Sequence, residues 1–344
     1  MIFVNGRLIR DYTMGVSRYT NELVNRFSDK AHLIKPEGLA KKGKGLLWEQ
    51  LLLPRKIREN DLLWSPANTG PILVENQVIT IHDLIPYDHP EWYSQAYSIY
   101  YKNLSPRITK VVKKIITDSN YSKKRIIDQF NVPKSKVVVI PLGVGEEFLP
   151  VAEHKIEDVL IKYGVTSPFF FVLGTIEPRK NLGRLFKAWE IIRLKYPQYK
   201  LVVAGIGIAP SAKIKNLTFP RGVKNIGYVD NQDLPALYSG ANAFIFPSIY
   251  EGFGLPLLEA MACGTPVIAS NVTSIPEVVG EAGVLFDPFD INDIASSIEK
   301  ILHDGELRED LREKGFKQAR KFSWDTTAEK VWAVLSQTIT EINS

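Results

Sequence analysis

Short apolar runs alternate with longer amphipathic segments along the whole chain. The runs are rich in β-branched and aromatic residues, whereas the segments between them carry apolar residues at helical spacing. In the first half, strands are expected at 2–4, 62–64, 77–81, 114–117 and 136–140, with helices between them, one near 16–27. In the second half, strands are expected at 169–174, 200–204, 223–226, 243–246, 266–269 and 284–286. This alternation predicts the α/β class, with two doubly wound, Rossmann-like domains built on parallel sheets.

The two series of strands predict a boundary near Pro150, after the turn-rich run 141–145. The first domain is therefore expected at 1–150 and the second at 151–322. A last segment, 323–344, follows a break at Phe322-Ser323 and has helical apolar spacing through Leu335. From its spacing alone this segment could pack on either domain.

Composition narrows the class of protein. The chain has 344 residues, 45% hydrophobic and 24% charged, which is typical of a globular protein. Its single cysteine, Cys263, excludes an intramolecular disulfide framework and a cysteine-rich zinc site, and it fits a reducing compartment. No apolar run approaches the roughly 18 residues of a membrane span, and the opening run Ile2–Val4 is too short for a signal peptide. A cytoplasmic protein is expected.

Charge is distributed unevenly between the two halves. Residues 1–150 hold 22 Lys and Arg against 15 Asp and Glu, a balance of +7, whereas the remainder holds 21 against 23, a balance of −2. A basic half favours an acidic partner, such as nucleic acid, anionic lipid head groups or a phosphorylated substrate, or else it is a solvated surface.

The segment 248–266 reads as strand end, loop, short helix and next strand. Gly252 and Gly254 permit a tight turn, Pro256 suits the start of a helix, and Gly264 suits its end. The backbone N–H groups near 253–257, together with the helix dipole, would form a cradle for an anion such as phosphate.

Two glutamates flank this turn, Glu251 before the helix and Glu259 in its expected first turn. Each carboxylate could accept two hydrogen bonds from a vicinal diol. The alternative interpretation makes Glu251 a loop charge and Glu259 a residue favoured by the helix dipole.

A second turn, 174–182, follows the expected strand 169–174 and opens another helix, with Asn181 as its expected N-cap. It places Arg179 and Lys180 at the carboxyl end of a strand. The arginine fork could bind a diphosphate while the lysine adds a point charge. Two solvated cations are the plainer alternative.

Two glycine-rich stretches nearly match nucleotide-binding motifs. The run 38–45 lacks the Ser or Thr of a P-loop, because Gly45 occupies that position, and 205–210 has Pro210 where a dinucleotide fingerprint needs its third glycine. NAD binding is therefore not expected.

Several motifs together resemble the retaining nucleotide-sugar glycosyltransferases of family 4. The resemblance rests on Glu251-Gly-Phe-Gly-Leu-Pro-Leu-Leu-Glu259, on the turn Gly174 to Asn181, and on Ile81-His82-Asp83. It extends over nearly the whole chain through 15–19, 118–122, 140–144 and 322–324. It implies the GT-B fold, two Rossmann-like domains facing a cleft, with the final helix crossing back to the N-terminal domain.

The resemblance implies an acceptor-binding N-terminal domain and a donor-binding C-terminal domain. Glu251 would hold hydroxyls of the donor sugar and Glu259 the nucleotide ribose. Arg179 and Lys180, beside Gly174, would hold the diphosphate.

The remaining site residues also come from the resemblance. The backbone N–H groups of Phe253, Gly254 and Leu255 would line the sugar and phosphate pocket. Gly15 would face the diphosphate from the other domain, although this chain has one glycine there where many relatives have two or three. His82 would lie beside the transferred sugar.

The activity implied is transfer of a hexose with retention and without a metal, and no Asp-x-Asp metal motif is evident. We expect GDP-mannose as the donor because the chain resembles bacterial surface-polysaccharide mannosyltransferases, with UDP-sugars as alternatives. The acceptor would be a glycan or a lipid-linked oligosaccharide, and the basic flanks of 46–52, namely Lys41, Lys42, Lys44, Arg55, Lys56 and Arg58, could contact an anionic membrane.

Three other functions stay open from the sequence. A hydrolase or epimerase of nucleotide sugars with the same fold would keep the phosphate-binding turns. A non-catalytic sugar-nucleotide binding subunit would keep them without turnover. A nucleic-acid binder would explain the charge but not the paired glutamates, so no nucleic-acid partner is expected.

Overall fold

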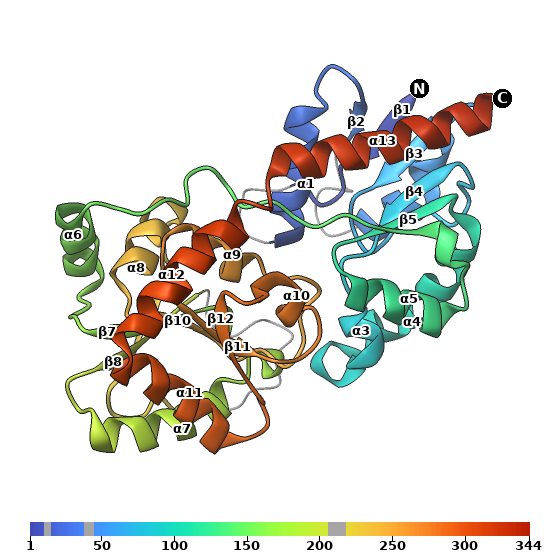
Figure 1. Ribbon diagram of the computed structural model, residues 1–344. Coiled ribbons are helices and arrows are strands. Elements are labelled where there is room, and N and C mark those ends of the chain that lie inside the picture. Colours follow the sequence, from blue (N-terminus) through green and yellow to red (C-terminus); the bar gives the residue numbers. More distant parts are fainter. Residues whose placement is uncertain (10–14, 38–44, 206–217) are drawn as a thin grey trace. The chain divides into compact units, whose positions relative to one another are not determined.

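The computed structural model describes residues 1–9, 15–37, 45–205 and 218–344, which divide into two compact units (Figure 1). The first unit comprises Met1–Gly143 and Ser323–Ser344, and the second comprises Val144–Phe322. The division lies a few residues before the boundary predicted at Pro150. Each unit is a parallel sheet with helices, which confirms the predicted fold class.

The first unit contains a six-stranded sheet in the order β2-β1-β3-β4-β5-β6. All of its strand pairs are parallel. The strands are β1 (Ile2–Asn5), β2 (His32–Ile34), β3 (Leu62–Ser65), β4 (Gln77–Thr80), β5 (Lys114–Thr117) and β6 (Val137–Val139). The sequence did not predict β2, a three-residue edge strand with only two apolar residues, Leu33 and Ile34.

The helices of the first unit alternate with these strands. They are α1 (Gly15–Arg26), α2 (Gly45–Leu47), η2 (Trp48–Leu52), η3 (Pro54–Lys56), α3 (Ile85–Asp88), η4 (Pro90–Trp92), α4 (Gln95–Val111), α5 (Asn120–Phe130), η5 (Lys134–Lys136) and α13 (Trp324–Asn343). The apolar faces of α4 and α5 pack with Ile79 and Ile115 of the sheet.

Helix α13 belongs to the first unit although it ends the chain. Its N-cap, Ser323, accepts a hydrogen bond from the Thr326 N–H at 3.1 Å, and the helix packs against α1 and β3. At its start the backbone touches Gly143, where a Cβ atom would lie 2.1 Å from the Trp324 nitrogen. The predicted return of the last helix to the N-terminal domain is confirmed.

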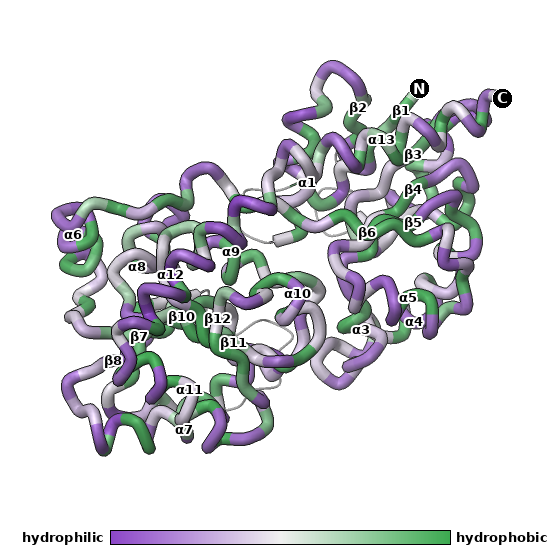
Figure 2. The backbone as a smooth tube through the Cα atoms, viewed as in Figure 1, coloured by the Kyte–Doolittle hydropathy of each residue, from purple (hydrophilic) through white to green (hydrophobic). Residues whose placement is uncertain are grey.

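The second unit contains a six-stranded parallel sheet in the order β12-β11-β10-β7-β8-β9. The strands are β7 (Phe169–Leu173), β8 (Lys200–Ala204), β9 (Val223–Gly227), β10 (Ala243–Phe246), β11 (Val267–Ser270) and β12 (Gly283–Phe286). Figure 2 shows the hydrophobic character of β10 and β11, which are buried along their whole length.

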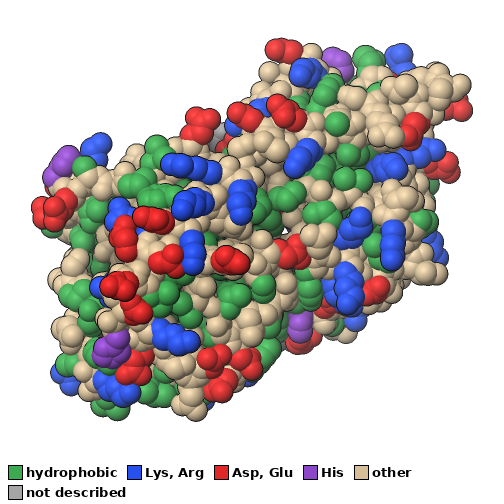
Figure 3. Space-filling model, in the orientation of Figure 1, with side chains coloured by type: hydrophobic (Ala, Val, Ile, Leu, Met, Phe, Trp, Pro, Cys, Tyr) green, Lys and Arg blue, Asp and Glu red, His purple; other side chains and the backbone are tan. Residues whose placement is uncertain are grey.

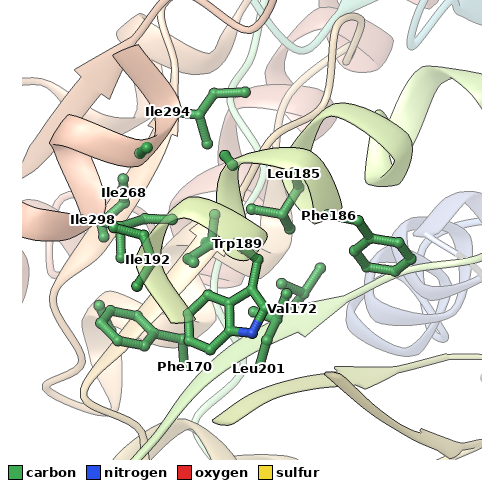
Figure 4. Packing of buried hydrophobic residues seen from close by; sticks show 14 of the residues in the cluster. Phe170, Val172, Leu185, Phe186, Trp189, Ile192, Leu201, Ile268, Ile294 and Ile298 are labelled. Atoms are coloured by element: carbon green, nitrogen blue, oxygen red, sulfur yellow. The ribbon is translucent and has the colours of Figure 1, made fainter. Parts of the chain in front are cut away.

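The helices of the second unit cover both faces of this sheet. They are α6 (Glu153–Tyr163), η6 (Pro178–Lys180), α7 (Leu182–Lys195), η7 (Asn231–Asp233), α8 (Leu234–Gly240), α9 (Leu255–Ala262), α10 (Ile275–Val279), α11 (Ile291–His303) and α12 (Gly305–Ala319). Figure 4 shows how Trp189 of α7 packs against Phe170 of β7 and Ile298 of α11 lies in the same cluster. This core fixes α7, and with it the turn that precedes α7.

Both signs of charge lie side by side on the outer surface of α12 (Figure 3). Lys314 pairs there with Asp310 at 2.7 Å. Such exposed pairs contribute little to stability. Among the described residues, none of the helices combines the length and the apolar character that crossing a bilayer requires.

Candidate functional site

The two turns singled out in the sequence end neighbouring strands of the second sheet. Strand β7 precedes the turn with Arg179 and Lys180, and β10 precedes the loop with Glu251. Because β7 and β10 are adjacent and parallel, their carboxyl ends lie at the same edge of the sheet. Ligands of open α/β sheets bind at this edge.

At this edge Glu251 accepts contacts from both cations. Its Oε1 atom lies 2.7 Å from Lys180 Nζ and 2.7 Å from Arg179 Nη1. The three side chains are between 11 and 19% exposed, so the cluster is largely shielded from water but still reachable. We call Arg179, Lys180 and Glu251 the cation–carboxylate cluster.

A second carboxylate, not predicted from the sequence, fixes the arginine. Arg179 Nη2 lies 2.7 Å from Glu177 Oε1, and the Thr175 hydroxyl donates to the same oxygen at 2.7 Å. The guanidinium is therefore held from two sides, by Glu177 and by Glu251. The signal was present in the sequence, since Glu177 stands two residues before Arg179, but only the folded turn shows which cation it meets.

The surroundings favour the charged form of Glu251 and disfavour that of Lys180. Burial opposes ionisation of Glu251, yet the charges of Arg179 and Lys180 outweigh it and lower the pKa of this carboxyl to about 2. Burial, followed by the charge of Arg179, lowers the pKa of Lys180. Glu251 is thus ionised at neutral pH and offsets part of the positive charge.

The two turns are tied to one another through the backbone. The Ile249 N–H donates to the Arg179 carbonyl at 2.8 Å, and the Glu251 N–H donates to Thr273 Oγ1 at 3.2 Å. Lys180 Nζ also lies 4.8 Å from the centre of the Phe246 ring, a cation–π contact. These contacts fix the positions of the charged groups before any ligand arrives.

Asn181 occupies the N-cap position of α7 but does not cap it with its side chain. Its Nδ2 instead donates to the Pro288 carbonyl at 2.8 Å, and its Oδ1 accepts from Arg184 at 3.0 Å. The expected side-chain cap is therefore wrong: Asn181 adopts a left-handed conformation that directs its amide elsewhere.

Gly174, at the end of β7, lies against the end of β8. A Cβ atom on Gly205 would come 2.2 Å from the Gly174 carbonyl oxygen, and one on Gly174 would come 3.1 Å from Lys180 Cε. The absence of side chains at these two positions lets the strand ends and Lys180 approach closely.

The residues of the expected anion cradle lie at the start of α9. Gly254 is the N-cap with φ of 126°, a conformation that favours glycine. Within the described parts of the chain, the N–H groups of Phe253, Gly254 and Leu255 make no hydrogen bond. The Ser274 hydroxyl lies 2.9 Å from the carbonyls of Glu251 and Phe253 and so fixes this loop.

Glu259 differs from the expectation in its position on α9. The expectation was the first turn of the helix. The helix begins at Leu255, so Glu259 is its fifth residue and lies in the second turn. The side chain is buried, and Oε2 accepts a hydrogen bond from the Tyr238 hydroxyl at 3.0 Å. Its predicted contact with a ribose stays a prediction.

His82 lies in the first unit, just after β4, and is buried. Its Nδ1 lies 2.7 Å from Asp118 Oδ2 and its Nε2 lies 3.2 Å from the Pro66 carbonyl. Burial disfavours the charged ring, but the Asp118 carboxylate outweighs it and raises the pKa of His82. Both ring nitrogens are thus engaged within the unit, which favours a structural role; the predicted place beside a sugar stays a prediction.

Gly15 is the first residue of α1, and a Cβ atom there would meet nothing within 4 Å. Its predicted contact with a diphosphate also stays a prediction. The near-motif runs 38–45 and 205–210, and the basic residues Lys41, Lys42 and Lys44, fall largely or wholly outside the described residues.

Comparison with known families identifies the class of protein. Residues 161–318 match the family described as "Glycosyl transferases group 1", and residues 60–148 match "Glycosyltransferase Family 4". The chain is 37% identical over 265 residues to the O-antigen chain mannosyltransferase B of Escherichia coli, covering 74% of this chain and 68% of that protein. The chain therefore belongs to the family 4 glycosyltransferases, whose two domains these matches cover.

Other relatives differ in length. The serotype-specific mannosyltransferase WbdA of Escherichia coli is 33% identical over 262 residues, 73% of this chain, and the match spans about a third of WbdA, 32%. The MMP alpha-(1->4)-mannosyltransferase of Mycolicibacterium hassiacum is 27% identical over 70% of this chain and 57% of that protein.

Solved structures share the fold. The glycosyltransferase WaaG has a TM-score of 0.74 at 16% identity, and Anabaena Alr3699/HepE in complex with UDP and glucose has a TM-score of 0.77 at 17% identity. Both matches cover 97% of this chain and 99% of the solved chain. They confirm the GT-B fold, and together with the family they identify a glycosyltransferase.

Proposed function

We propose that this glycosyltransferase moves a mannosyl group from GDP-mannose to a glycan, free or carried on a lipid, in the synthesis of a surface polysaccharide. The choice of sugar follows the mannosyltransferases to which the chain is similar. The observation that carries the proposal is the cation–carboxylate cluster, which places Arg179 and Lys180 at the carboxyl edge of the sheet beside the open N–H groups that begin α9.

The donor diphosphate binds Arg179 and Lys180 in this proposal. Together with Glu177 and Glu251 these cations form a neutral set of four charges, so a diphosphate must displace a carboxylate to gain their full charge. Glu251 is the partner that exchanges, because it touches both cations through one oxygen. Glu177 stays and orients the guanidinium.

Glu251, once released from the cations, binds hydroxyls of the donor sugar. This exchange couples diphosphate binding to sugar recognition. The diphosphate replaces Glu251 as the partner of the two cations, and the released carboxylate can then bind the sugar hydroxyls. The N–H groups of Phe253, Gly254 and Leu255 supply further hydrogen bonds to the phosphate or sugar. Gly174 leaves room for Lys180, and Glu259 holds the ribose.

The reaction needs stabilisation of a leaving group more than a nucleophile from the chain. As the bond from the anomeric carbon to the diphosphate breaks, its electron pair passes to the phosphate, where Arg179 and Lys180 stabilise the charge. The acceptor oxygen bonds to the anomeric carbon on the same face, and its proton passes to the departing phosphate oxygen. The proposed transfer retains configuration and takes its positive charge from side chains instead of a metal.

A panel of nucleotide sugars tests this function. GDP-mannose should raise the melting temperature more than UDP-glucose or UDP-N-acetylglucosamine at equal concentration, since a selective ligand stabilises the folded state by mass action. Product analysis with GDP-mannose and a mannose-containing acceptor should then show that the acceptor glycan is extended, even when EDTA is present to bind metal ions. Free mannose or an epimer as the only product would favour a hydrolase or an epimerase, and binding without turnover would favour a non-catalytic subunit.

A further inference from the structure

Three tyrosine rings are stacked along one face of α4 and lead from the core of the first unit to its surface. Tyr93 stacks on Tyr97 with ring centres 5.4 Å apart, and Tyr97 stacks on Tyr101 with ring centres 6.2 Å apart. Tyr101 is completely buried, whereas Tyr97 is 36% exposed. We call these three residues the tyrosine ladder. An aromatic ring that is held by a buried neighbour and still partly exposed offers a rigid, flat surface to a ligand.

Hydrogen bonds from α4 place the ladder at the carboxyl edge of the first sheet. The Tyr101 hydroxyl donates to the carbonyl of Asp83, which follows β4, at 3.3 Å. The Tyr100 hydroxyl accepts from Gln50 Nε2 at 3.4 Å. Tyr97 lies one helical turn before both tyrosines and therefore on the same face of α4. Its exposed ring thus lies at the edge where open α/β sheets bind their ligands.

The charges around the Tyr97 phenol agree with this placement. Partial burial and then the negative charge of Asp83 raise the pKa of Tyr97, and the positive charge of Arg7 opposes this rise. Arg7 follows β1 and Asp83 follows β4, so groups from two strand ends act on the same phenol.

Arg7 is held at this edge by two partners. Its Nε donates to Glu49 Oε1 at 2.9 Å, and its Nη2 donates to Thr69 Oγ1 at 2.6 Å. The Arg7 side chain is 15% exposed, and among the residues that the structure describes its Nη1 has no hydrogen-bond acceptor. The carboxylate of Glu49 balances the charge of the guanidinium. Arg7 can therefore offer an oriented N–H donor from a pair with no net charge.

Asn68 brings a second donor from the strand between these two. It follows β3, which lies between β1 and β4 in the sheet, and its Oδ1 accepts from the His82 backbone N–H at 2.7 Å. Asn68 is half-buried, and within the described ranges its Nδ2 donates to no other atom. The bond to His82 fixes the amide plane, so this N–H group is oriented before a ligand binds.

A flat aromatic ring beside oriented N–H donors matches the chemistry of an uncharged sugar ring. One face of a pyranose carries C–H groups, which pack on the negative face of an aromatic ring, and its rim carries hydroxyls that accept hydrogen bonds from arginine and asparagine. An anionic ligand would gain less, because Glu49 already balances Arg7 and Asp83 places negative charge near the Tyr97 phenol.

We propose that the first unit binds an uncharged pyranose ring of the acceptor glycan, stacked on Tyr97 of the tyrosine ladder, with Arg7 and Asn68 donating to its hydroxyls. The inference rests on the proposed function in naming this glycan an acceptor. Binding of the glycan needs no donor and can be measured without one. The ladder therefore determines affinity for the acceptor, and the charged groups of the second unit determine affinity for the donor.

Saturation-transfer NMR with the full chain and uncharged trisaccharides tests the site. The probes are α-mannotriose, maltotriose and chitotriose, and we expect at least one of them to bind with an affinity that salt hardly changes. Tyr97→Ala should weaken binding of that trisaccharide about tenfold, because the stacking surface is lost. Tyr97→Phe keeps the ring and should bind like the parent chain. Tyr97→Leu, which keeps apolar bulk without a ring, repeats the test if the alanine variant does not fold.

A second variant and a control address the donor and the helix. Asn68→Asp keeps an acceptor for the His82 N–H but removes the amide donor, so it should weaken glycan binding about fivefold. Ile99→Ala is the matched control, because Ile99 is 54% exposed on the same helix but lies two residues from Tyr97 and faces another side. It should bind the glycan normally.

Three results would overturn the inference. They are failure of the parent chain to bind any of the three probes, equal binding by the parent chain and by Tyr97→Ala or Tyr97→Leu, and a loss in Tyr97→Phe as large as that in Tyr97→Ala. The last result would show that the ring is not the binding surface.

Transfer kinetics separate this inference from the proposed function. Tyr97→Ala should raise the KM for the acceptor and leave the KM for the donor unchanged. A parent chain that binds a glycan through Tyr97 but transfers nothing from GDP-mannose would contradict the proposed function and leave the glycan site in place. Normal transfer with an unchanged acceptor KM in Tyr97→Ala would overturn the glycan site and leave the proposed function in place.

Discussion

Two charged clusters follow strand ends in this protein, and they differ in what remains available to a ligand. In the second unit, Arg179 and Lys180 share one oxygen of Glu251 and keep part of their surface exposed. In the first unit, His82 and Asp118 are 7 and 2% exposed, and the second ring nitrogen is also engaged. Similar charges at similar places in a fold therefore serve different purposes: the first cluster can exchange a partner, and the second cannot without breaking buried contacts.

Replacing the arginine should give the largest effect of any single change. Arg179→Ala removes a cation that stabilises the leaving diphosphate, so kcat/KM should fall about 10³-fold, as for loss of a preorganised donor in a transition state. Steady-state kinetics with the donor varied would measure this. Lys187→Ala, an exposed cation on α7, is the control and should change nothing. A loss below tenfold for Arg179→Ala would place the diphosphate elsewhere.

Breaking the buried pair of His82 and Asp118 should lower the stability of the first unit. Asp118→Asn leaves His82 without its charged partner, and breaking such a buried pair costs about 3 kcal/mol. Urea unfolding followed by tryptophan fluorescence would measure the loss in the first unit, while GDP affinity should stay unchanged. If Asp118→Asn unfolds like the parent chain but loses transfer, His82 acts on the sugar, and the contrast between the two clusters disappears.

A methyl group at the cradle should have an intermediate effect. Gly254→Ala forces a side chain into a conformation with φ of 126° and sets its Cβ 3.1 Å from Leu257 Cδ1. Strain of this kind costs on the order of 1–3 kcal/mol. Relief of this strain would move the N–H groups that begin α9 away from the phosphate, so GDP affinity should fall about tenfold. Calorimetric titration would measure it. Gly183→Ala is the control, since a Cβ there meets nothing within 4 Å, and it should bind GDP normally.

Loss of the orienting carboxylate should be the mildest change. Glu177→Gln keeps the shape of the side chain but weakens its hold on Arg179, so kcat should fall roughly tenfold with little change in KM. Glu190→Gln, on the exposed side of α7, is the control. A change in KM alone would mean that Glu177 contributes to binding and not to orientation of the guanidinium.

Much of this architecture could be predicted from the sequence. All strands except β2 were expected from the sequence, and the central strands such as β10 and β11 were the clearest, because parallel strands buried on both faces are continuous apolar runs. The turns with Arg179 and Glu251 were found because they follow such runs. The ion-pair partners of these residues could not be predicted from the sequence. Glu251 contacts both cations because β7 and β10 are neighbours, and only the order of strands in the folded sheet makes them so.

The engagement of His82 likewise could not be read from its neighbours in sequence. Asp118 and Pro66 reach it from two other strand ends, far apart along the chain. Glu259 was expected in the first turn of α9 but lies in the second, because the helix begins at Leu255. The N-cap, Gly254, has no side chain that would have marked this start in the sequence.

The exchange at Glu251 is the central claim, and GDP titration of Glu251→Gln beside its transfer assay tests it most directly. The substitution removes a competitor for Arg179 and Lys180 and also the group that binds the sugar. GDP should therefore bind as tightly as to the parent chain or more tightly, while transfer falls by more than about 10²-fold. Equal loss of GDP affinity and of transfer would contradict the account.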